Sequence, residues 1–452
     1  MFALTYRPAA ALGAAGISLV LLLSGCSGGS TGKDDAVARA PISSAEIDKA
    51  MSTPTTLTFW EANKLQPEID LFEKKYPAIT VKLVDAGSGT DYYTKLRSAI
   101  KAGEGAPDVA QIEYHHMPSF ILGGALADLT PYGAADVEKQ FQPFAWSQVA
   151  TKNGIYGIPQ DTGPLGLLYR SDLFAQAQVS VPATWADFAG AAAQIHQADK
   201  ARYITNISPS NASATLGLFW QAGARPFAYD GKQTVSVKLN SPEMKKVAEY
   251  WQDLVGKDLV SVDPDFTDQW FQGLANGKYA SWVSAAWGPV FLQGTAADTA
   301  GRWRAAELPQ WTAGAKASGN VGGSANAVLK SSKNPIAAAK FAEFLNGDPE
   351  SALKLGTGVP LFPAATSALN DPALTGNKNA FFGGQQVTKL FTQISPTVGT
   401  DFQWLPFMDP VFDSYNKTFG KALTEKTSLT AALDAWQAEV VAYAKSQGFT
   451  VS

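Results

Sequence analysis

In this 452-residue sequence, the side chains best suited to chemistry are carboxylates that stand next to hydroxyl or aromatic residues. Asp161 and Thr162 lie in the segment Pro-Gln-Asp-Thr-Gly, where a predicted strand meets a glycine-rich break. A carboxylate accepts charge-assisted hydrogen bonds, and an aromatic face packs against apolar C–H groups. Together these properties suit the binding of a small polar molecule. Further candidates at the ends of predicted strands are Trp60, Glu61, Glu113 and Tyr114.

The aromatic residues are numerous, with 12 Trp, 14 Tyr and 24 Phe, and some are expected to line a binding site. Trp287 is the leading candidate for a ring that stacks on a ligand, and Trp282 is near it in the sequence. Gly322 and Gly323 would let backbone N–H groups approach a ligand closely, because glycine has no side chain. Packing in the core or at a hinge is the alternative for each ring. Other ring candidates are Trp220, Phe382 and Trp404.

Motifs typical of hydrolases and metal sites are absent from the sequence. No Gly-x-Ser-x-Gly segment follows a predicted strand, and no His-Glu-x-x-His segment occurs. His115 and His116 are adjacent, but the sequence holds only 3 His, and His196 is distant. We therefore expect no catalytic residue, no cofactor and no metal site. A secreted glycosidase that uses two carboxylates stays open as an alternative, because acidic residues occur in suitable loops.

The first 25 residues have the pattern of a secretory signal. Arg7 is followed by an apolar run from Ala9 to Leu23, which ends in Leu-Ser-Gly-Cys26. The run is about 15 residues long and so falls short of the roughly 20 that a membrane-spanning helix needs. The last four residues resemble the bacterial lipobox, which implies lipidation of Cys26 and an anchor on the extracytoplasmic face of the cell membrane. Residues 26–52 would then form a flexible tether.

Composition limits the classes of partner. The formal net charge is −4, and no block of basic residues supports a nucleic-acid partner. About 425 residues remain after the signal, which is more than one compact core usually holds and is natural for two lobes. A monomer is expected.

Alternating segments of strand and helix pattern follow residue 55. Strands are predicted at 56–60, 79–84 and 108–112, and helices at 67–76 and 92–102. This order predicts a parallel sheet covered by helices, in which ligands bind outside the carboxyl ends of the strands. Later helices are predicted at 185–196, after the N-cap Thr184, and at 242–254, 266–275, 335–345 and 429–446. Glycine-rich segments near 155–170, 285–289 and 319–327 are predicted to cross between lobes.

Several segments in this order resemble those of a known family. They are Phe72-Glu-Lys-Lys-Tyr-Pro-Ala-Ile79, Ala106-Pro-Asp-Val109, Tyr156-Gly-Ile-Pro159, Leu168-Tyr-Arg-Ser-Asp-Leu-Phe174, Pro182-Ala-Thr-Trp-Ala-Asp-Phe188, Gly277-Lys-Tyr-Ala280 and Ala337-Ala-Ala-Lys-Phe341. The chain is similar over nearly all of its mature length to the family 1 extracellular solute-binding proteins. These are the maltose-binding-protein-like subunits of ATP-binding-cassette sugar importers.

The resemblance implies an α/β fold of two lobes, of the periplasmic-binding-protein-like type II, with the ligand cleft between them. Residues 53–162 plus 286–325 would form the N-terminal lobe, and 163–285 plus 326–452 the C-terminal lobe. It also implies a lipoprotein that captures a carbohydrate and delivers it to a permease without catalysis. Aromatic platforms and carboxylates suit a sugar ring, which has apolar faces and hydroxyl edges. Glycerophosphodiesters and polyamines are the alternative ligands, although Arg170 and Arg225 do not form a basic cluster.

Overall fold

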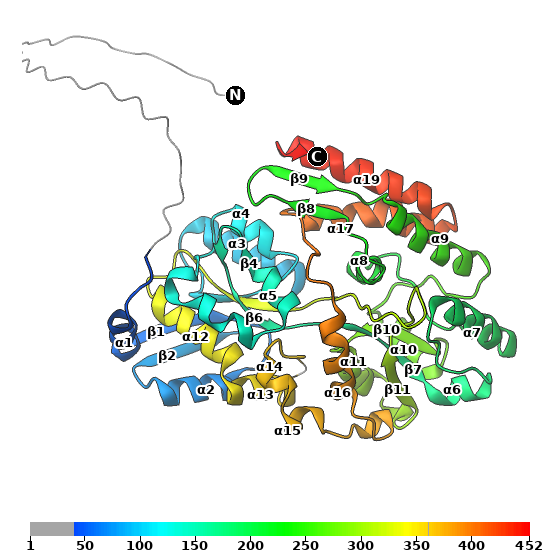
Figure 1. The fold of residues 1–452 in the computed structure, drawn as a ribbon, viewed down its shortest axis with the longest axis horizontal. Coiled ribbons are helices and arrows are strands. Elements are labelled where there is room, and N and C mark those ends of the chain that lie inside the picture. Colours follow the sequence, from blue (N-terminus) through cyan, green and yellow to red (C-terminus); the bar gives the residue numbers. More distant parts are fainter. Residues whose placement is uncertain (1–39, 360) are drawn as a thin grey trace, which may run out of the picture. The chain divides into compact units, whose positions relative to one another are not determined.

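The computed structural model describes residues 40–359 and 361–452, and the account below concerns those residues (Figure 1). The predicted signal peptide, Cys26 and the first part of the tether lie outside them. The expected flexible tether over residues 26–52 is wrong at its end, because Ser44–Ser52 form the helix α1, which has a capping box and packs against α12 (Pro335–Gly347). Within the described part of the chain, every helix is too short or too polar to span a lipid bilayer.

The first sheet has five strands in the order β2-β1-β3-β12-β6. Its parallel part consists of β1 (Thr55–Trp60), β2 (Ile79–Val84) and β3 (Val109–Glu113), joined by the helices α2 (Gln66–Lys75) and α3 (Gly89–Ala102). This part confirms the strands and helices predicted from sequence periodicity. β12 (Ser324–Val328) then runs antiparallel between β3 and β6 (Ile158–Asp161).

Aromatic packing joins this sheet to its covering helices. In β1 the buried side chains alternate, and Leu57 and Phe59 have no exposed surface. The ring of Phe341 packs edge-on against Phe59 at 5.3 Å and against Phe72 of α2 at 5.1 Å. Phe341 belongs to α12 (Pro335–Gly347), shown in yellow in Figure 1, so this late helix covers the first sheet.

The second sheet is antiparallel, in the order β10-β7-β11. Its strands are β7 (Leu165–Arg170), β10 (Ser281–Ala285) and β11 (Trp303–Glu307). The helices α7 (Trp185–Ala198), α8 (Ala212–Gln221) and α9 (Pro242–Gly256) belong to the same part of the chain. Thr184 caps α7 as predicted, because its side chain accepts a hydrogen bond from the Asp187 backbone N–H in a capping box.

The strand pairings divide the chain differently from the expected lobe boundaries. Residues 286–325 were expected in the N-terminal lobe, yet β11 lies within that range and pairs with β7 of the second sheet. Residues 326–452 were expected in the C-terminal lobe, yet α12 packs on the first sheet. The segment at Trp287 is a short link from β10 into α11 (Gly288–Thr295) instead of a crossing. Periodicity identifies a strand but not the sheet it joins, since that depends on distant partners.

Two connections between the sheets lie against each other. The first joins β6 to β7 through Thr162–Pro164, and the second joins β11 to β12 through residues 308–323. The Gly163 backbone N–H donates to Asn320 Oδ1 at 2.7 Å, and the Val321 N–H donates to the Gly163 carbonyl at 2.9 Å. A Cβ atom on Gly163 would stand 1.9 Å from the Val321 carbonyl oxygen, so only glycine allows this approach.

The remaining helices and strands lie outside the two sheets described above. The final helix, red in Figure 1, packs beside α9. Further helices are α1 (Ser44–Ser52), α4 (Met117–Leu122), α5 (Pro143–Val149), α6 (Ser171–Gln176), α10 (Asp268–Asn276), α13 (Pro349–Thr357), α14 (Thr366–Leu369), α15 (Pro372–Thr375), α16 (Val387–Ile394), α17 (Met408–Tyr415), α18 (Lys421–Glu425) and α19 (Leu429–Ser446). Short strands are β4 (Ala150–Thr151), β5 (Gly154–Ile155), β8 (Phe227–Tyr229), β9 (Thr234–Val237) and β13 (Thr450–Val451).

Candidate functional site

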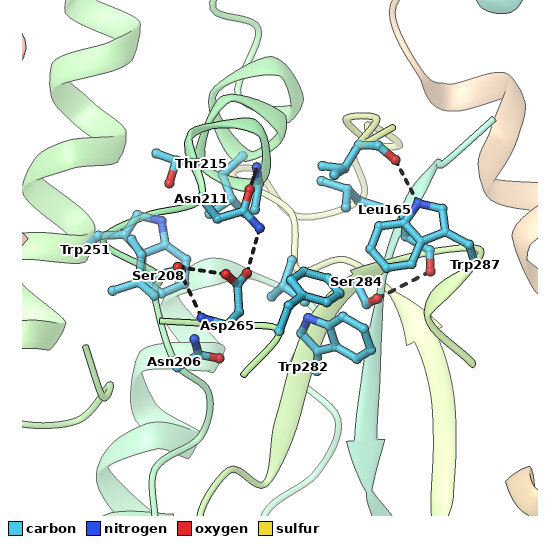
Figure 2. Close-up of a pocket in the computed structure, with 17 residues that line it drawn as sticks. Leu165, Asn206, Ser208, Asn211, Thr215, Trp251, Asp265, Trp282, Ser284 and Trp287 are labelled. Atoms are coloured by element: carbon cyan, nitrogen blue, oxygen red, sulfur yellow. Dashed lines mark hydrogen bonds between the residues drawn. The ribbon is translucent and has the colours of Figure 1, made fainter. Parts of the chain in front are cut away.

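An aromatic cluster forms around Trp287, where β10 ends and α11 begins. The Trp287 indole N–H donates to the Val321 carbonyl at 3.0 Å, which fixes the ring beside the second connection between the sheets. Trp282 meets the ring edge-on at 6.0 Å, and Phe291 of α11 does so at 5.5 Å. Phe291 is 42% exposed, so the cluster has an open face. Figure 2 shows Trp282 and Trp287 on the same side of the cavity.

A polar wall faces this cluster across a cavity of about 50 Å³. Its central group is Asp265, whose carboxylate accepts hydrogen bonds from Ser208 Oγ at 2.9 Å and from Asn211 Nδ2 at 2.6 Å (Figure 2). Burial raises the pKa of Asp265 above its ordinary value. Trp251 also lines the cavity, and its buried indole N–H has no hydrogen-bond partner within residues 40–359 and 361–452. The wall therefore offers carboxylate acceptors and a spare donor.

Phe266 directly follows Asp265, lines the cavity and has an unusual backbone conformation. Its φ is +57°, a left-handed value that residues other than glycine adopt at a cost of about 1–3 kcal/mol. The ring is 42% exposed and lies 6.0 Å from the ring of Trp287. Residues 266–275 were expected to form one helix, but α10 begins at Asp268 after the N-cap Thr267. Phe266 therefore belongs to the site instead of the helix, and sequence periodicity did not identify it.

Asp161 is the last residue of β6 at the edge of the first sheet, and the first connection begins directly after it. It is 7% exposed, and Ser324 Oγ donates to its Oδ1 at 2.5 Å. Burial raises the pKa of Asp161 to about 6, and the negative charge of Glu113 acts in the same direction. Thr162, which follows, is fully buried, and its hydroxyl has no partner among the described residues.

Glu61 is fully buried and is connected to Asp161 through hydrogen bonds. Its Oε1 accepts from the backbone and side-chain N–H groups of Asn63, at 2.9 and 2.8 Å, and its Oε2 accepts from Gln160 Nε2 at 3.0 Å. Ser324 Oγ lies 3.0 Å from Gln160 Oε1, so one network runs from Glu61 to Asp161. Burial raises the pKa of Glu61 to about 7. Because Glu61 has no exposed surface, its role in this structure is to position the network.

Other predicted residues also lie around these connections. Tyr114 is only 2% exposed, and its hydroxyl donates to the Asp161 carbonyl at 3.0 Å. A Cβ atom on Gly323 would stand 2.8 Å from the Tyr114 ring, and one on Gly322 would stand 3.3 Å from the Trp287 indole nitrogen. Both glycines have a left-handed φ, so the chain turns tightly here. The structure thus brings Asp161, Trp287 and both glycines to one place.

Glu113 and Trp60 lie at the ends of their strands in the first sheet. Glu113 has a side chain that is 42% exposed, and Tyr93 Oη lies 3.3 Å from its Oε2. Trp60 is half-buried and meets Tyr92 edge-on at 6.4 Å. Both positions agree with the rule that led to their prediction, since they are the last residues of β3 and β1, at the carboxyl ends of these strands.

Three predicted rings lie outside the cavity at Trp287. Trp220 stacks on Phe402 at 4.2 Å, with 11° between the ring planes, and its indole N–H donates to the Gly399 carbonyl. Trp404 meets Phe402 edge-on at 4.9 Å and lines a different cavity of about 420 Å³ with Tyr114. Phe382 is fully buried beside β11. Their faces do not line the cavity at Trp287.

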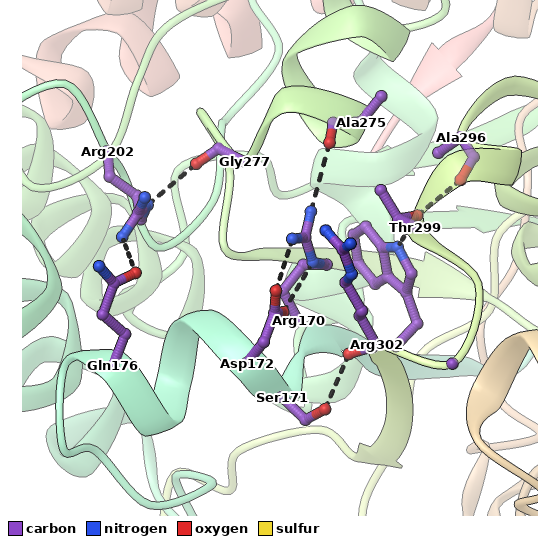
Figure 3. Close-up of polar contacts among 12 residues, drawn as sticks. Arg170, Ser171, Asp172, Gln176, Arg202, Ala275, Gly277, Ala296, Thr299 and Arg302 are labelled. Carbon is purple, nitrogen blue, oxygen red and sulfur yellow. Dashed lines mark hydrogen bonds and ion pairs between the residues drawn. The ribbon is translucent and has the colours of Figure 1, made fainter.

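The arginines considered for an anionic ligand already have partners. Arg170 is 4% exposed and forms a two-point ion pair with Asp172, at 2.8 and 2.7 Å, as Figure 3 shows. It also donates to the Ala275 carbonyl at 3.3 Å. Arg225 pairs with Asp401. Neither guanidinium lines the cavity at Trp287.

Comparison with known proteins finds a family and relatives that are similar to most of the chain. A sequence model of the family described as bacterial extracellular solute-binding protein matches residues 60–352. An arabinooligosaccharide-binding protein of Bacillus subtilis (strain 168) is 27% identical over 329 residues, which cover 69% of this chain and 74% of the relative.

Two solved structures are also similar. The binding protein associated with an ABC transporter of B. animalis subsp. lactis Bl-04, in complex with beta-1,6-galactobiose, is 33% identical with a TM-score of 0.75. The match covers 88% of this chain and 99% of that one. The galacto-N-biose-/lacto-N-biose I-binding protein of Bifidobacterium longum, in complex with lacto-N-biose, is 28% identical with a TM-score of 0.76, and the match covers 88% and 98%. These likenesses confirm the two-lobed type II fold expected from the sequence.

Proposed function

Because this chain belongs to the family of bacterial extracellular solute-binding proteins, we propose that it binds a short carbohydrate and delivers it to the permease of an ABC importer. One observation carries the proposal. The rings of Trp287, Trp282 and Phe266 face the buried carboxylate of Asp265 across one cavity, beside the connections between the two sheets. The similar proteins in complex with disaccharides support the class of ligand.

The two walls match the two surfaces of a sugar. Its C–H faces would stack on Trp287 and Phe266, and its hydroxyl groups would donate to the carboxylate of Asp265. Asp161 lies outside the lining of the present cavity and would accept a hydroxyl once the lobes open. Hydrogen bonds to charged acceptors contribute about 1.5–3 kcal/mol each, more than neutral ones. Ser208 and Asn211 already hold Asp265 in place, so this side chain loses little conformational entropy when a ligand binds.

A sugar ring needs more room than the present cavity of about 50 Å³. Pockets for small molecules usually measure roughly 300–1,000 Å³. We infer that the ring of Phe266 moves aside and that the two lobes open about the paired connections at Gly163 and Val321. Ligand would then shift the population towards a closed form that the permease recognises. No chemical conversion of the ligand is part of this cycle.

The N-terminal pattern supports the proposed location. Lipidation of Cys26 would hold the protein on the extracytoplasmic face of the membrane. The tether would end before α1 (Ser44–Ser52), because this helix packs against α12. The protein is proposed to act as a monomer, with the permease as its protein partner.

A titration of ligands tests the proposal. Isothermal titration calorimetry with disaccharides of galactose, arabinose and glucose is expected to identify at least one that binds. Trp287→Ala should then weaken its binding about ten- to a hundredfold, because a stacking ring is lost. Trp311→Ala is the matched control, since Trp311 is also half-buried but lies outside the cavity.

Three results would contradict the proposal. They are equal losses of affinity in Trp287→Ala and Trp311→Ala, hydrolysis of the bound sugar, and binding of a glycerophosphodiester or polyamine in place of every sugar. A charged ligand would also show a strong dependence of affinity on salt, whereas a neutral sugar should show little.

A further inference from the structure

Two histidines and a glutamate gather at the end of β3. Glu113, His115 and His116 each offer one ligand atom, and these atoms all lie within 4.8 Å of one another. The closest approach recorded within the group is 3.8 Å, between His115 Nε2 and Glu113 Oε2. The rings of the two histidines are 4.2 Å apart and tilted by 40°. Sequence spacing suggested only a pair of histidines, whereas the structure adds the carboxylate.

A fourth group comes from the other part of the chain. Asp409 begins the first turn of α17, which packs on α8 and α19, and its Oδ1 lies 3.7 Å from His116 Nδ1. The ligand atoms of a tetrahedral zinc ion, with bonds of about 2.0–2.1 Å, stand roughly 3.3 Å apart. The 3.8 Å between His115 Nε2 and Glu113 Oε2 is within half an ångström of that spacing, whereas Asp409 stands outside the group whose ligand atoms all lie within 4.8 Å of one another. Asp409 therefore suits the role of a carboxylate that orients a metal-bound His116.

We propose that Glu113, His115 and His116 form a binding site for a divalent transition-metal cation, with Zn²⁺ as the best match, and that Asp409 positions the ring of His116. Two imidazoles and a carboxylate are ligands that zinc accepts, whereas Mg²⁺ and Ca²⁺ prefer sites made of oxygen alone. Asp409 Oδ2 lies 3.3 Å from Arg97 Nη2, so this ion pair holds one oxygen and leaves Oδ1 beside His116 Nδ1.

A metal ion here would link the two sides of the proposed sugar site. Glu113 pairs with Ser324 across the first sheet, and Ser324 donates to Asp161. Asp409 belongs to the helices grouped with the second sheet. Through His116 and Asp409, the bound cation would thus connect the first sheet, at the end of β3, to α17. This inference does not depend on which ligand the neighbouring site takes.

Calorimetric titration with zinc sulfate tests the proposal. The protein is prepared without a histidine tag and freed of metal with a chelator. We expect one Zn²⁺ per chain and no binding of Mg²⁺. His115→Ala should weaken zinc binding by at least tenfold, and Asp409→Asn should weaken it by about tenfold, the smaller effect usual for a carboxylate next to a metal-bound histidine. His116 is not changed, because its ring is buried against Tyr93 at 3.6 Å.

His196→Ala is the matched control. It is the third of the 3 His in the sequence and also stands beside a carboxylate, with its Nε2 3.9 Å from Asp258 Oδ2. It should leave zinc binding unchanged. The proposal is overturned if no saturable zinc binding occurs, if His115→Ala binds zinc like the parent protein, or if His196→Ala abolishes binding. Unchanged affinity in Asp409→Asn would overturn the link between the two sides. Thermal melts of each variant confirm that it is folded.

Discussion

The buried carboxyl of Glu61 should make the stability of the protein fall as pH rises, and Glu61→Gln should remove this effect. Glu61 has no exposed surface, and burial raises its pKa from the usual 4.5 to about 7. The folded protein therefore holds this proton over a pH range in which the unfolded chain has lost it. Stability falls with rising pH wherever the folded state binds more protons.

The size of the effect follows from the two pKa values. The interval from 4.5 to about 7 corresponds to roughly 3 kcal/mol of unfolding free energy, lost progressively across that window. Glutamine at this position carries no charge, but its amide group would face the N–H donors of Gln160. The mismatched hydrogen bond costs about 1 kcal/mol at every pH. The variant should therefore be about 1 kcal/mol less stable than the parent near pH 4 and about 2 kcal/mol more stable above pH 7.

Urea unfolding of the ligand-free protein between pH 4 and 8 measures both curves. The two stabilities are expected to cross within this range. Parallel curves, with a constant difference between parent and variant, would refute the reasoning, because they would mean that Glu61 titrates alike in the folded and unfolded chains. Asp161→Asn serves as a second probe of the same network, since its pKa is raised to about 6 by burial.

Two further predictions concern the site and its hinge. Sugar affinity should rise as pH increases from 5 to 7, because Asp161, with a pKa of about 6, accepts hydroxyl donors best when ionised; calorimetry at several pH values should show this rise in the parent protein and its loss in Asp161→Asn. Gly163→Ala should destabilise the protein by more than about 2 kcal/mol, since the added Cβ would stand 1.9 Å from the Val321 carbonyl oxygen. Gly190→Ala is the control, because a Cβ atom there meets nothing within 4 Å. A thermal melt of Gly163→Ala like that of the parent or of Gly190→Ala would contradict the prediction.

Local patterns in the sequence predicted the elements of the first sheet well. The alternation around Leu57 and Phe59 predicted β1, and the spacing of Ile69 and Phe72 predicted α2. Thr184 marked the start of α7 through its capping box. These features depend on residues within a few positions of one another, so they are readable without any knowledge of the fold.

The composition of the candidate site was predicted only in part. Asp161 and Trp287 stand at the ends of strands, where the fold type leads one to expect ligands, and the structure brings them to neighbouring connections. Phe266 was assigned to a helix because its left-handed backbone leaves no mark in the hydrophobic pattern. Glu61 and Tyr114 were expected to face a ligand, but hydrogen bonds to Asn63, Gln160 and the Asp161 carbonyl hold them inside the protein.

Local sequence patterns predict the strand–helix order, the family resemblance and the kinds of side chain available for binding. The folded chain was needed to learn that β11 joins the second sheet, that α12 covers the first, and that Asp409 stands beside His116. Secondary structure follows from contacts within one or two turns, whereas sheet order and side-chain meetings depend on pairs of residues hundreds of positions apart. Many such pairings satisfy the same local pattern, and the packing of the whole chain selects one of them.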